Sequence, residues 1–455
     1  MKKMKFFQYN YILILILIFL FSLESCKSPT APNNKNLTLT ISDVSCTEAW
    51  ITLSSNNVPL PANILIKKNG NEFLNINLVN KDTALYDSSL LPNQTYSYQA
   101  VYNNGFNLGM SEVVSAKTMD TTSNNYSWQL YTLGNALGAS STLYDVAIIN
   151  DTSIWAVGEI NIQDSIGMFN AVHWDGKNWN LKRIEYYTVC GQTNRTPYPA
   201  RSILAYNENE IWIAVYGDQI AEIENGIQTK TMCVPWSFVI NKIWGMNTNE
   251  FYLVGNSGNI IHYQTGNWQK IESGTTQDLY DIYSNDGQTI YASGGNFQNY
   301  SGILLRGNNN GFQTLEEGEN IGDPNLLFDP YFDGIAKTVW SSNTGSLYFG
   351  GNELYIYKNG TISEDKTLAG NSEGENVNGE YFGFISQIRG TAVNDIFLVG
   401  ERNTIRHFNG VRWQQLGMPY DQSSDFTWLS ISMKNGLAVV VGYTRSNAII
   451  MVLKK

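Results

Sequence analysis

Three histidines are the residues of this 455-residue chain whose types and spacing first suggest acid–base chemistry. His173, His262 and His407 each stand six residues before a tryptophan, in segments of similar sequence. An imidazole can exchange protons near neutral pH. Because all three share one repeat position, beside an aromatic residue, a common structural cause explains them better than three catalytic roles. No nucleophile–base, zinc-protease or phosphate-loop pattern accompanies them, so we predict no catalytic residue.

An acidic segment, residues 316–334, is the strongest candidate for a metal site. Its carboxylates belong to Glu316, Glu317, Glu319, Asp323, Asp329 and Asp333. Calcium binds carboxylate oxygens, but this segment lacks the regular ligand spacing of a calcium loop. We therefore expect a solvated acidic loop, and we predict no metal and no cofactor.

The first 25 residues are typical of an export signal. Three lysines precede an apolar run, residues 11–21, that is short for a membrane span. Residues 23–26, LESC, resemble the lipobox of bacterial lipoproteins, apart from Glu24, where a small or apolar residue is usual. The resemblance implies lipid attachment at Cys26, a polar tether over residues 26–36, and a protein of the cell envelope held at the outer membrane. An ordinary signal peptide, residues 1–25, with an incidental cysteine is the alternative.

The other three cysteines are odd in number, so at most one disulfide forms within the chain. Cys190 and Cys233 flank the second repeat unit, and export would bring them into an oxidising compartment. Sequence alone leaves open both a disulfide between them and two thiols, since it does not show their separation in space. Cys46 is expected as a buried thiol. The spacings match no zinc motif.

Composition favours an all-β protein. Charged residues make up only 15% of the chain and aromatic residues 13%, with 27 Tyr and 12 Trp. This balance suits many short strands better than long solvated helices. The formal net charge of −11 argues against nucleic acid as a partner.

Residues 37–119 contain short alternating strands separated by Asn and Gly clusters. The segment LLPNQTY, residues 90–96, resembles the fibronectin type III pattern, in which Leu and Pro precede a corner tyrosine. Trp50 stands where that family has an early core tryptophan. The resemblance implies a β-sandwich with the Tyr96 hydroxyl bonded to nearby backbone and Trp50 in the core. Residues 120–126 are expected to be a linker.

Residues 127–455 contain an internal repeat. The segments NEFYLVG (249–255), NDIFLVG (394–400) and SIWAVG (153–158) each combine a polar turn with a strand, and weaker copies bring the number of units to seven. These repeats resemble those of exported bacterial β-propellers. The resemblance implies a seven-bladed propeller in which an N-terminal strand near Trp128 completes the last blade.

Loop length distinguishes the two faces of such a propeller. One face, here called the long-loop face, carries the connections between strands two and three of a blade and from strand four to the next blade. The long insertions all belong to it: residues 159–168, 186–201, 295–302, 316–334 and 363–384. Long loops on a rigid scaffold often carry function. The candidate ligand residues are its aromatic side chains, Tyr186, Tyr187, Tyr198, Phe297, Tyr300, Tyr331 and Tyr381.

These features predict an exported, lipid-anchored binding protein whose long-loop face recognises an extracellular glycan or protein. A glycan-active hydrolase or lyase with paired carboxylates on that face is the alternative, because propellers also host enzymes. An assembly scaffold of the cell envelope is the third hypothesis.

Overall fold

The computed structural model describes residues 37–103, 108–136, 138–247, 249–318, 332, 334–358, 360–365, 368, 383–417 and 425–455. Cys26, the export signal and the tether therefore lie outside the described residues, as do Tyr331, Tyr381 and most of the acidic segment. The chain divides into two compact units between Thr118 and Met119. No helix among the described residues is long and apolar enough to cross a membrane.

The first unit is a sandwich of two antiparallel sheets with the orders β1-β2-β5 and β4-β3-β6-β7, with β8 also paired to β6. Its strands are β1 (Leu37–Val44), β2 (Ala49–Ser55), β3 (Ala62–Lys68), β4 (Asn71–Leu78), β5 (Asp82–Asp87), β6 (Thr95–Asn103), β7 (Leu108–Met110) and β8 (Val114–Lys117). Alternate residues of β2 and β3 are buried between the sheets, as expected of strands with one apolar face. The Cys46 thiol is buried in this unit.

The tyrosine corner of this unit is present, but the tryptophan lies elsewhere. The backbone N–H of Leu91 donates to the Tyr96 hydroxyl at 2.9 Å. Trp50, expected in the core, alternates with buried Ala49 and Ile51 and so points to the outer side of its sheet. Its ring packs on Tyr86, its cross-strand partner on β5, at 5.4 Å between centroids. The prediction of a core role for Trp50 is wrong, because the buried positions of β2 are the alternate ones, Ala49 and Ile51, and not Trp50.

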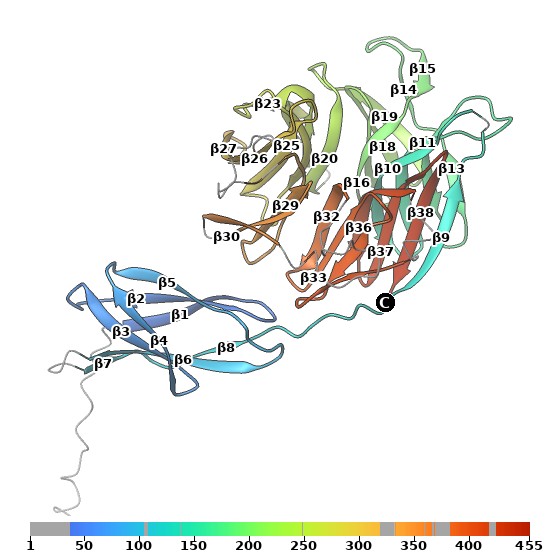
Figure 1. Ribbon diagram of the computed structural model, residues 1–455. Helices are drawn as coiled ribbons and strands as arrows, with labels where there is room; N and C mark the ends of the chain where they lie inside the picture. The colour runs from blue at the N-terminus through green and yellow to red at the C-terminus, as the bar shows by residue number, and fades with distance from the viewer. Residues whose placement is uncertain are drawn as a thin grey trace, which may run out of the picture. The chain divides into compact units, whose positions relative to one another are not determined.

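The second unit is a β-propeller of seven four-stranded sheets within the described residues (Figure 1). Blade 1 consists of β10 (Thr142–Asn150), β11 (Ser153–Ile160), β12 (Phe169–Trp174) and β13 (Trp179–Lys182). Blade 2 consists of β16 (Ala200–Asn207), β17 (Glu210–Val215), β18 (Gln219–Glu224) and β19 (Ile227–Cys233). Blade 3 consists of β20 (Ile240–Asn247), β21 (Glu250–Gly255), β22 (Ile260–Gln264) and β23 (Asn267–Ile271), with the short helix η1 (Asn256–Gly258) after β21.

The remaining blades follow the same order from the axis outward. Blade 4 consists of β24 (Asp278–Tyr283), β25 (Ile290–Asn296), β26 (Ser301–Asn308) and β27 (Gly311–Gly318). Blade 5 consists of β28 (Ala336–Ser341), β29 (Leu347–Gly351), β30 (Leu354–Lys358) and β31 (Thr361–Glu364). Blade 6 consists of β32 (Ile385–Ala392), β33 (Asp395–Gly400), β34 (Ile405–Phe408) and β35 (Trp413–Gln415). Blade 7 consists of β36 (Phe426–Lys434), β37 (Leu437–Thr444), β38 (Asn447–Lys454) and β9 (Ser127–Leu133).

Blade 7 confirms the predicted closure, because the N-terminal β9 is its outermost strand and pairs with β38 along seven residues (Figure 1). Closing the ring with both ends of the unit protects the seam where it would otherwise open. The expected linker, residues 120–126, also packs on the propeller. Asn394 donates a side-chain hydrogen bond to the Asp120 carbonyl at 2.8 Å, and the Tyr126 ring meets Phe397 edge to face.

Seven hydrophobic clusters, one at each seam between neighbouring blades, form the core of the propeller. The second strands contribute to the clusters on both of their sides, which explains why β21 and β33 are buried along nearly their whole length. A strand buried on both faces reads as a continuous apolar run rather than an alternating one. This is the physical origin of the repeated FYLVG and IFLVG segments.

Candidate functional site

A β-bulge in the first strand of every blade organises the centre of the propeller. In each blade the register between strands one and two slips by one residue near the start of strand one. The extra residues are Tyr144, Arg201, Asn241, Tyr280, Lys337, Ser386 and Leu429. A bulge leaves its extra residue out of the ladder and turns its side chain in a new direction. Here all seven side chains line one central pocket.

In six of the seven blades a glycine near the end of strand two lies opposite the bulge, and in blade 2 Val215 takes this position. A Cβ on Gly158 would lie 2.0 Å from the carbonyl oxygen of Thr142, and a Cβ on Gly255 would lie 2.0 Å from that of Val239. Gly294, Gly351 and Gly442 stand at the same place in their blades, where an added Cβ would also lie within 2.1 Å of a carbonyl oxygen. Only glycine allows this close approach of backbone. The repeated terminal glycine of the FYLVG-type segments is therefore the partner of the bulge.

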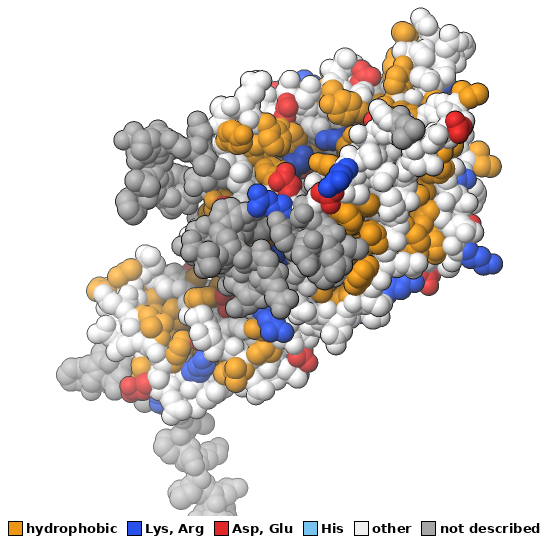
Figure 2. Space-filling model, turned by 45° about the vertical axis from the view of Figure 1, so that its right-hand side comes forward, with side chains coloured by type: hydrophobic (Ala, Val, Ile, Leu, Met, Phe, Trp, Pro, Cys, Tyr) orange, Lys and Arg blue, Asp and Glu red, His pale blue; other side chains and the backbone are white. Residues whose placement is uncertain are grey.

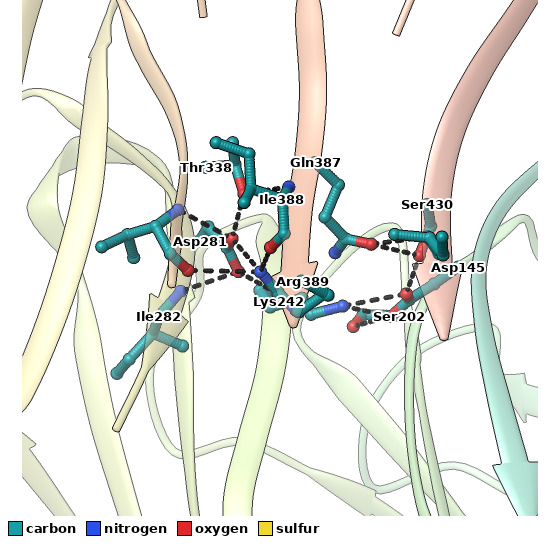
Figure 3. A network of polar contacts seen from close by, with 12 residues as sticks. Asp145, Ser202, Lys242, Asp281, Ile282, Thr338, Gln387, Ile388, Arg389 and Ser430 are labelled. Atoms are coloured by element: carbon teal, nitrogen blue, oxygen red, sulfur yellow. Dashed lines mark hydrogen bonds and ion pairs between the residues drawn. The ribbon is translucent and has the colours of Figure 1, made fainter. Parts of the chain in front are cut away.

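A ring of seven polar residues lies one position after the bulges and joins all seven blades. We call it the polar ring, and its members are Asp145, Ser202, Lys242, Asp281, Thr338, Gln387 and Ser430 (Figure 3). Asp145 accepts hydrogen bonds from Ser202 at 2.6 Å and from Ser430 at 2.7 Å, and it pairs with Lys242 at 2.8 Å. One carboxylate thus bonds to three other blades.

Asp281 is the second carboxylate of the polar ring. It accepts a hydrogen bond from Thr338 at 2.8 Å and forms a two-pronged ion pair with Arg389, a residue of β32. Burial alone would raise the pKa of Asp281, but the Arg389 guanidinium and its hydrogen bonds lower it. Asp145 follows the same pattern, because the Lys242 ammonium outweighs burial and lowers the pKa of that carboxyl. Both carboxylates are ionised, and a neighbouring cation neutralises each of them.

The central pocket has the polar ring as its base and the bulge residues as its wall. Its volume is about 90 Å³, and its lining also includes the polar-ring residues Asp145, Lys242, Asp281 and Gln387. The bulges lie near the start of the first strands, the end of each blade at which strand two finishes and the loop to strand three begins. The central pocket therefore belongs to the long-loop face.

Two basic side chains in the wall carry charge that the ring does not neutralise. Arg201 lies over the rings of Tyr144 and Tyr216, at 4.8 and 5.6 Å from their centroids. The Lys337 ammonium lies 4.2 Å from the centroid of the Tyr280 ring. Across the described part of the chain, neither side chain forms an ion pair or a hydrogen bond. Their partners are aromatic faces, which attract cations without cancelling the charge.

Aromatic side chains continue from the wall toward the surface and form a rim. Tyr216, 58% exposed, stands beyond Arg201, while Phe297, 48% exposed, packs on Tyr280 at 5.4 Å and on Phe384 at 5.8 Å. Tyr300 is also exposed at this turn. In the view of Figure 2, hydrophobic side chains lie beside Lys and Arg side chains on the surface of the propeller.

The candidate ligand residues differ in exposure and in their contacts. Phe297 joins the rim, and Tyr198 and Tyr300 are exposed on the long-loop face. Tyr187 is half-buried and stacks with Arg195 at 4.5 Å on a two-stranded hairpin, β14 (Glu185–Tyr187) and β15 (Arg195–Pro197). Tyr186 is fully buried and donates a hydrogen bond to the Ile213 carbonyl at 3.2 Å, so it cannot contact a ligand. The insertion folds as a hairpin, whose alternation points Tyr186 inward and Tyr187 outward.

The structure answers three other expectations, which concern one long loop, two acidic residues and a cysteine pair. Residues 295–302 form only a four-residue turn, because β25 continues to Asn296 and β26 begins at Ser301. Glu316 and Glu317 belong to β27 rather than to a loop. Cys190 and Cys233 form a disulfide, which ties the loop between β14 and β15 to the end of β19. Among the described residues, no group of three His, Cys, Asp or Glu side chains could hold a metal ion.

The histidines have matching surroundings, which supports a structural origin. His173, His262 and His407 each lie against an aromatic ring of the adjacent second strand, at 4.5 to 4.6 Å between centroids. Their Nε2 atoms meet Ser153, Glu250 and Asp395, which occupy equivalent positions at the start of that strand. None of the three lines the central pocket.

Comparisons with known proteins agree on the architecture alone. No protein-family model matches the chain, and no curated protein is similar to it. Among solved structures, one described as YCF48 bound to D1 peptide is similar with a TM-score of 0.51 at 12% identity, over 74% of this chain and 97% of that one. The WD40 propeller domain of Doa1 has a TM-score of 0.46 at 14% identity, covering 72% of this chain and 97% of its own. YCF48 from Cyanidioschyzon merolae has a TM-score of 0.47 at 10% identity, covering 71% and 98%. The chain is therefore a β-propeller protein.

Proposed function

We propose that this chain is a binding protein that holds a polypeptide partner on the long-loop face of its propeller. The observation that carries the proposal is the continuity between the exposed aromatic rim and the basic central pocket. Protein interfaces concentrate aromatic side chains and arginine at their centre and keep polar groups around them. Tyr216, Arg201 and Tyr144 form such a group on one side of the pocket, and Phe297 and Tyr280 on the other.

Three further points favour a polypeptide over the other hypotheses. The similar YCF48 structure is described as bound to a D1 peptide, and we extend that class of ligand to this chain. A neutral glycan, by contrast, would leave the charges of Arg201 and Lys337 without a counter-charge. An enzyme with paired carboxylates needs one carboxyl that stays protonated to act as an acid. Asp145 and Asp281, the carboxylates of the pocket, both have lowered pKa values and are held by cations.

Export and lipid attachment at Cys26 complete the proposal, supported by the sequence of the first 26 residues. The protein would then act in the cell envelope, with the sandwich and the propeller outside the cytoplasm. A Cys26→Ser variant is expected to lose incorporation of an alkyne-labelled fatty acid and to leave the membrane fraction. Retention of the label by this variant would contradict lipid attachment at Cys26.

Site-specific photocrosslinking tests the binding face. A photoreactive amino acid at position 216 or 297 is expected to yield the same protease-sensitive adduct in cells that express the full chain. The matched control is position 227, because Ile227 is 67% exposed at the start of β19, directly after the turn between strands three and four on the opposite face. Equal adducts from all three positions, or adducts that resist protease but yield to glycosidases, would contradict the proposal.

A further inference from the structure

The charge balance at the centre of the propeller is uneven. The polar ring contains two carboxylates, and a cation neutralises each of them. Lys242, also in the ring, pairs with Asp145, and Arg389, outside the ring, pairs with Asp281. The layer above, formed by the bulge residues, contains two more cations and no acid. Arg201 and Lys337 line the same pocket, and the pKa of Lys337 is lowered by burial and, to a smaller extent, by the Arg201 guanidinium. The pocket therefore presents two positive charges that repel each other and face the open side of the ring.

The other groups of the wall can complete the shell of an anion. Tyr144, Asn241 and Ser386 line the same pocket and carry hydroxyl or amide groups. The space of about 90 Å³ is far below the several hundred Å³ of a site for a whole small molecule. A carboxylate at the end of a side chain or of a polypeptide chain is of the right size, and a guanidinium matches it with two parallel hydrogen bonds.

We infer that Arg201 and Lys337 form a carboxylate-binding site at the centre of the long-loop face, which anchors an acidic group of the polypeptide partner. This inference rests on the proposed function and adds the chemistry of the ligand to it. The aromatic rim then contacts the residues on either side of the anchored group. The bound carboxylate supplies a negative charge to both cations, and it thereby offsets the repulsion between Arg201 and Lys337.

The electrostatic state of Lys337 makes the binding depend on pH. Burial, together with the nearby Arg201 guanidinium, lowers the pKa of Lys337 to about 7, and Asp281 opposes this shift. The groups that face it are Tyr280 and Asp281 on β24 and Arg201 on β16, and the Asp281 carboxylate is itself paired with Arg389 of β32. A bound carboxylate favours the charged ammonium, so binding takes up a proton above pH 7. Affinity should fall by up to about tenfold per pH unit above that point.

Three labelled peptides test the inference with the purified full chain, by fluorescence anisotropy. The first is hexaglutamate with an amidated C-terminus, the second is hexaglutamine with a free C-terminus, and the third is amidated hexaglutamine. We expect binding of the first or the second, which distinguishes a side-chain carboxylate from a terminal one, and none of the third. Arg201→Met and Lys337→Met should each weaken binding by at least about tenfold. Lys177→Met and Arg412→Met are the matched controls, because both side chains are exposed in turns of the opposite face.

The pH profile separates a direct role of Lys337 from a structural one. Between about pH 6 and about pH 9 the native chain should lose affinity, and Lys337→Arg, which stays charged, should bind with little change. Arg201→Met should move the loss of affinity to higher pH, because the neighbour that lowers the pKa of Lys337 is gone. A variant that merely disturbs folding would reproduce neither result.

Several outcomes would overturn the inference. They are equal binding of amidated hexaglutamine, unchanged affinity in both methionine variants, no binding of either carboxylate peptide at millimolar concentration, and binding of oligogalacturonate in place of the peptides. In any of these cases, polypeptide adducts at positions 216 and 297 that survive Arg201→Met and Lys337→Met would leave the proposed function standing. Loss of the adducts from the native chain would remove the proposed function itself.

Discussion

Asp281 of blade 4 and Arg389 of blade 6 form a two-pronged ion pair that passes beside blade 5, with Nη1–Oδ2 at 2.9 Å and Nη2–Oδ1 at 2.8 Å (Figure 3). The Arg389 guanidinium also donates to the carbonyl oxygens of Val339 and Ile388. Removing one member of a buried pair leaves the other charge without compensation, which costs about 3 to 5 kcal/mol. Through these contacts the pair links blades 4, 5 and 6 around the axis.

Asp281→Ala should lower the free energy of unfolding of the propeller by about 3 to 5 kcal/mol. Adding Arg389→Met should restore part of the loss, because the uncompensated guanidinium is then gone. Urea unfolding followed by tryptophan fluorescence measures both values, since every tryptophan except Trp50 lies in the second unit. Asp151→Ala, at an exposed turn, is the control. If Asp281→Ala behaves like this control, the ion pair does not hold the blades together.

The same carboxylates should make the propeller sensitive to acid. The pKa values of Asp145 and Asp281 are lower in the folded chain than the ordinary value of about 3.9 expected in the unfolded one. A lowered pKa stabilises the fold above the unfolded value, and this stabilisation is lost as the pH falls through the folded value. Stability should thus decline below about pH 4.

Tryptophan fluorescence between about pH 5 and about pH 2 measures this decline. In the Asp281→Asn, Arg389→Met double variant the pH dependence should be shallower, because one of the two titrating groups is absent. Retention of the full pH dependence by the double variant would show that other carboxylates dominate the acid transition.

Gly255→Ala should destabilise blade 3 by about 2 kcal/mol or more, because the new Cβ would lie 2.0 Å from the Val239 carbonyl oxygen and 2.7 Å from the Phe238 ring. The bulge at Asn241 would have to move, and with it part of the pocket wall. Gly217→Ala is the matched control, since its Cβ meets only a Val215 methyl at 3.3 Å. Equal denaturation midpoints for the two variants would refute the link between the glycine and the bulge.

The architecture was predictable from the sequence because its physical causes repeat in every blade. A second strand buried on both faces requires an unbroken apolar run, and in six of the seven blades a glycine ends this run beside the bulge, so Phe251 to Gly255 and Ile396 to Gly400 look alike. The closing strand near Trp128 was predictable for the same reason. Its sequence resembles the fourth strand of a repeat unit, but no first three strands precede it. The same burial and backbone contacts recur from blade to blade, so the same sequence pattern recurs as well.

The pocket was not predictable in the same way, because its residues share a position but no residue type. Tyr144, Arg201 and Lys337 hold equivalent bulge positions with entirely different side chains. The available signal was the polar residue that follows each of them inside an otherwise apolar first strand, as in LYDV, RSI and KTV. Aligning the first strands by this residue would have identified both layers. Tyr186 was misjudged because a loop of unknown conformation does not show which of two adjacent tyrosines faces inward.

Lys337→Met should make the propeller more stable near neutral pH while weakening carboxylate binding. The pKa of Lys337 is about 7 in the folded chain and about 10.4 when unfolded, so the unfolded chain holds more protons between these values. The free energy of unfolding then rises with pH across this window, and below it the folded state carries the full cost of a buried charge. The difference in free energy of unfolding between Lys337→Met and the native chain should be largest below pH 7 and should shrink toward pH 10, whereas Lys177→Met should show no such trend. Urea unfolding at a series of pH values measures the difference. A constant difference across the range would mean that the charged form of Lys337 does not destabilise the fold. Lys337 would then not carry the uncompensated positive charge that the proposed carboxylate site requires.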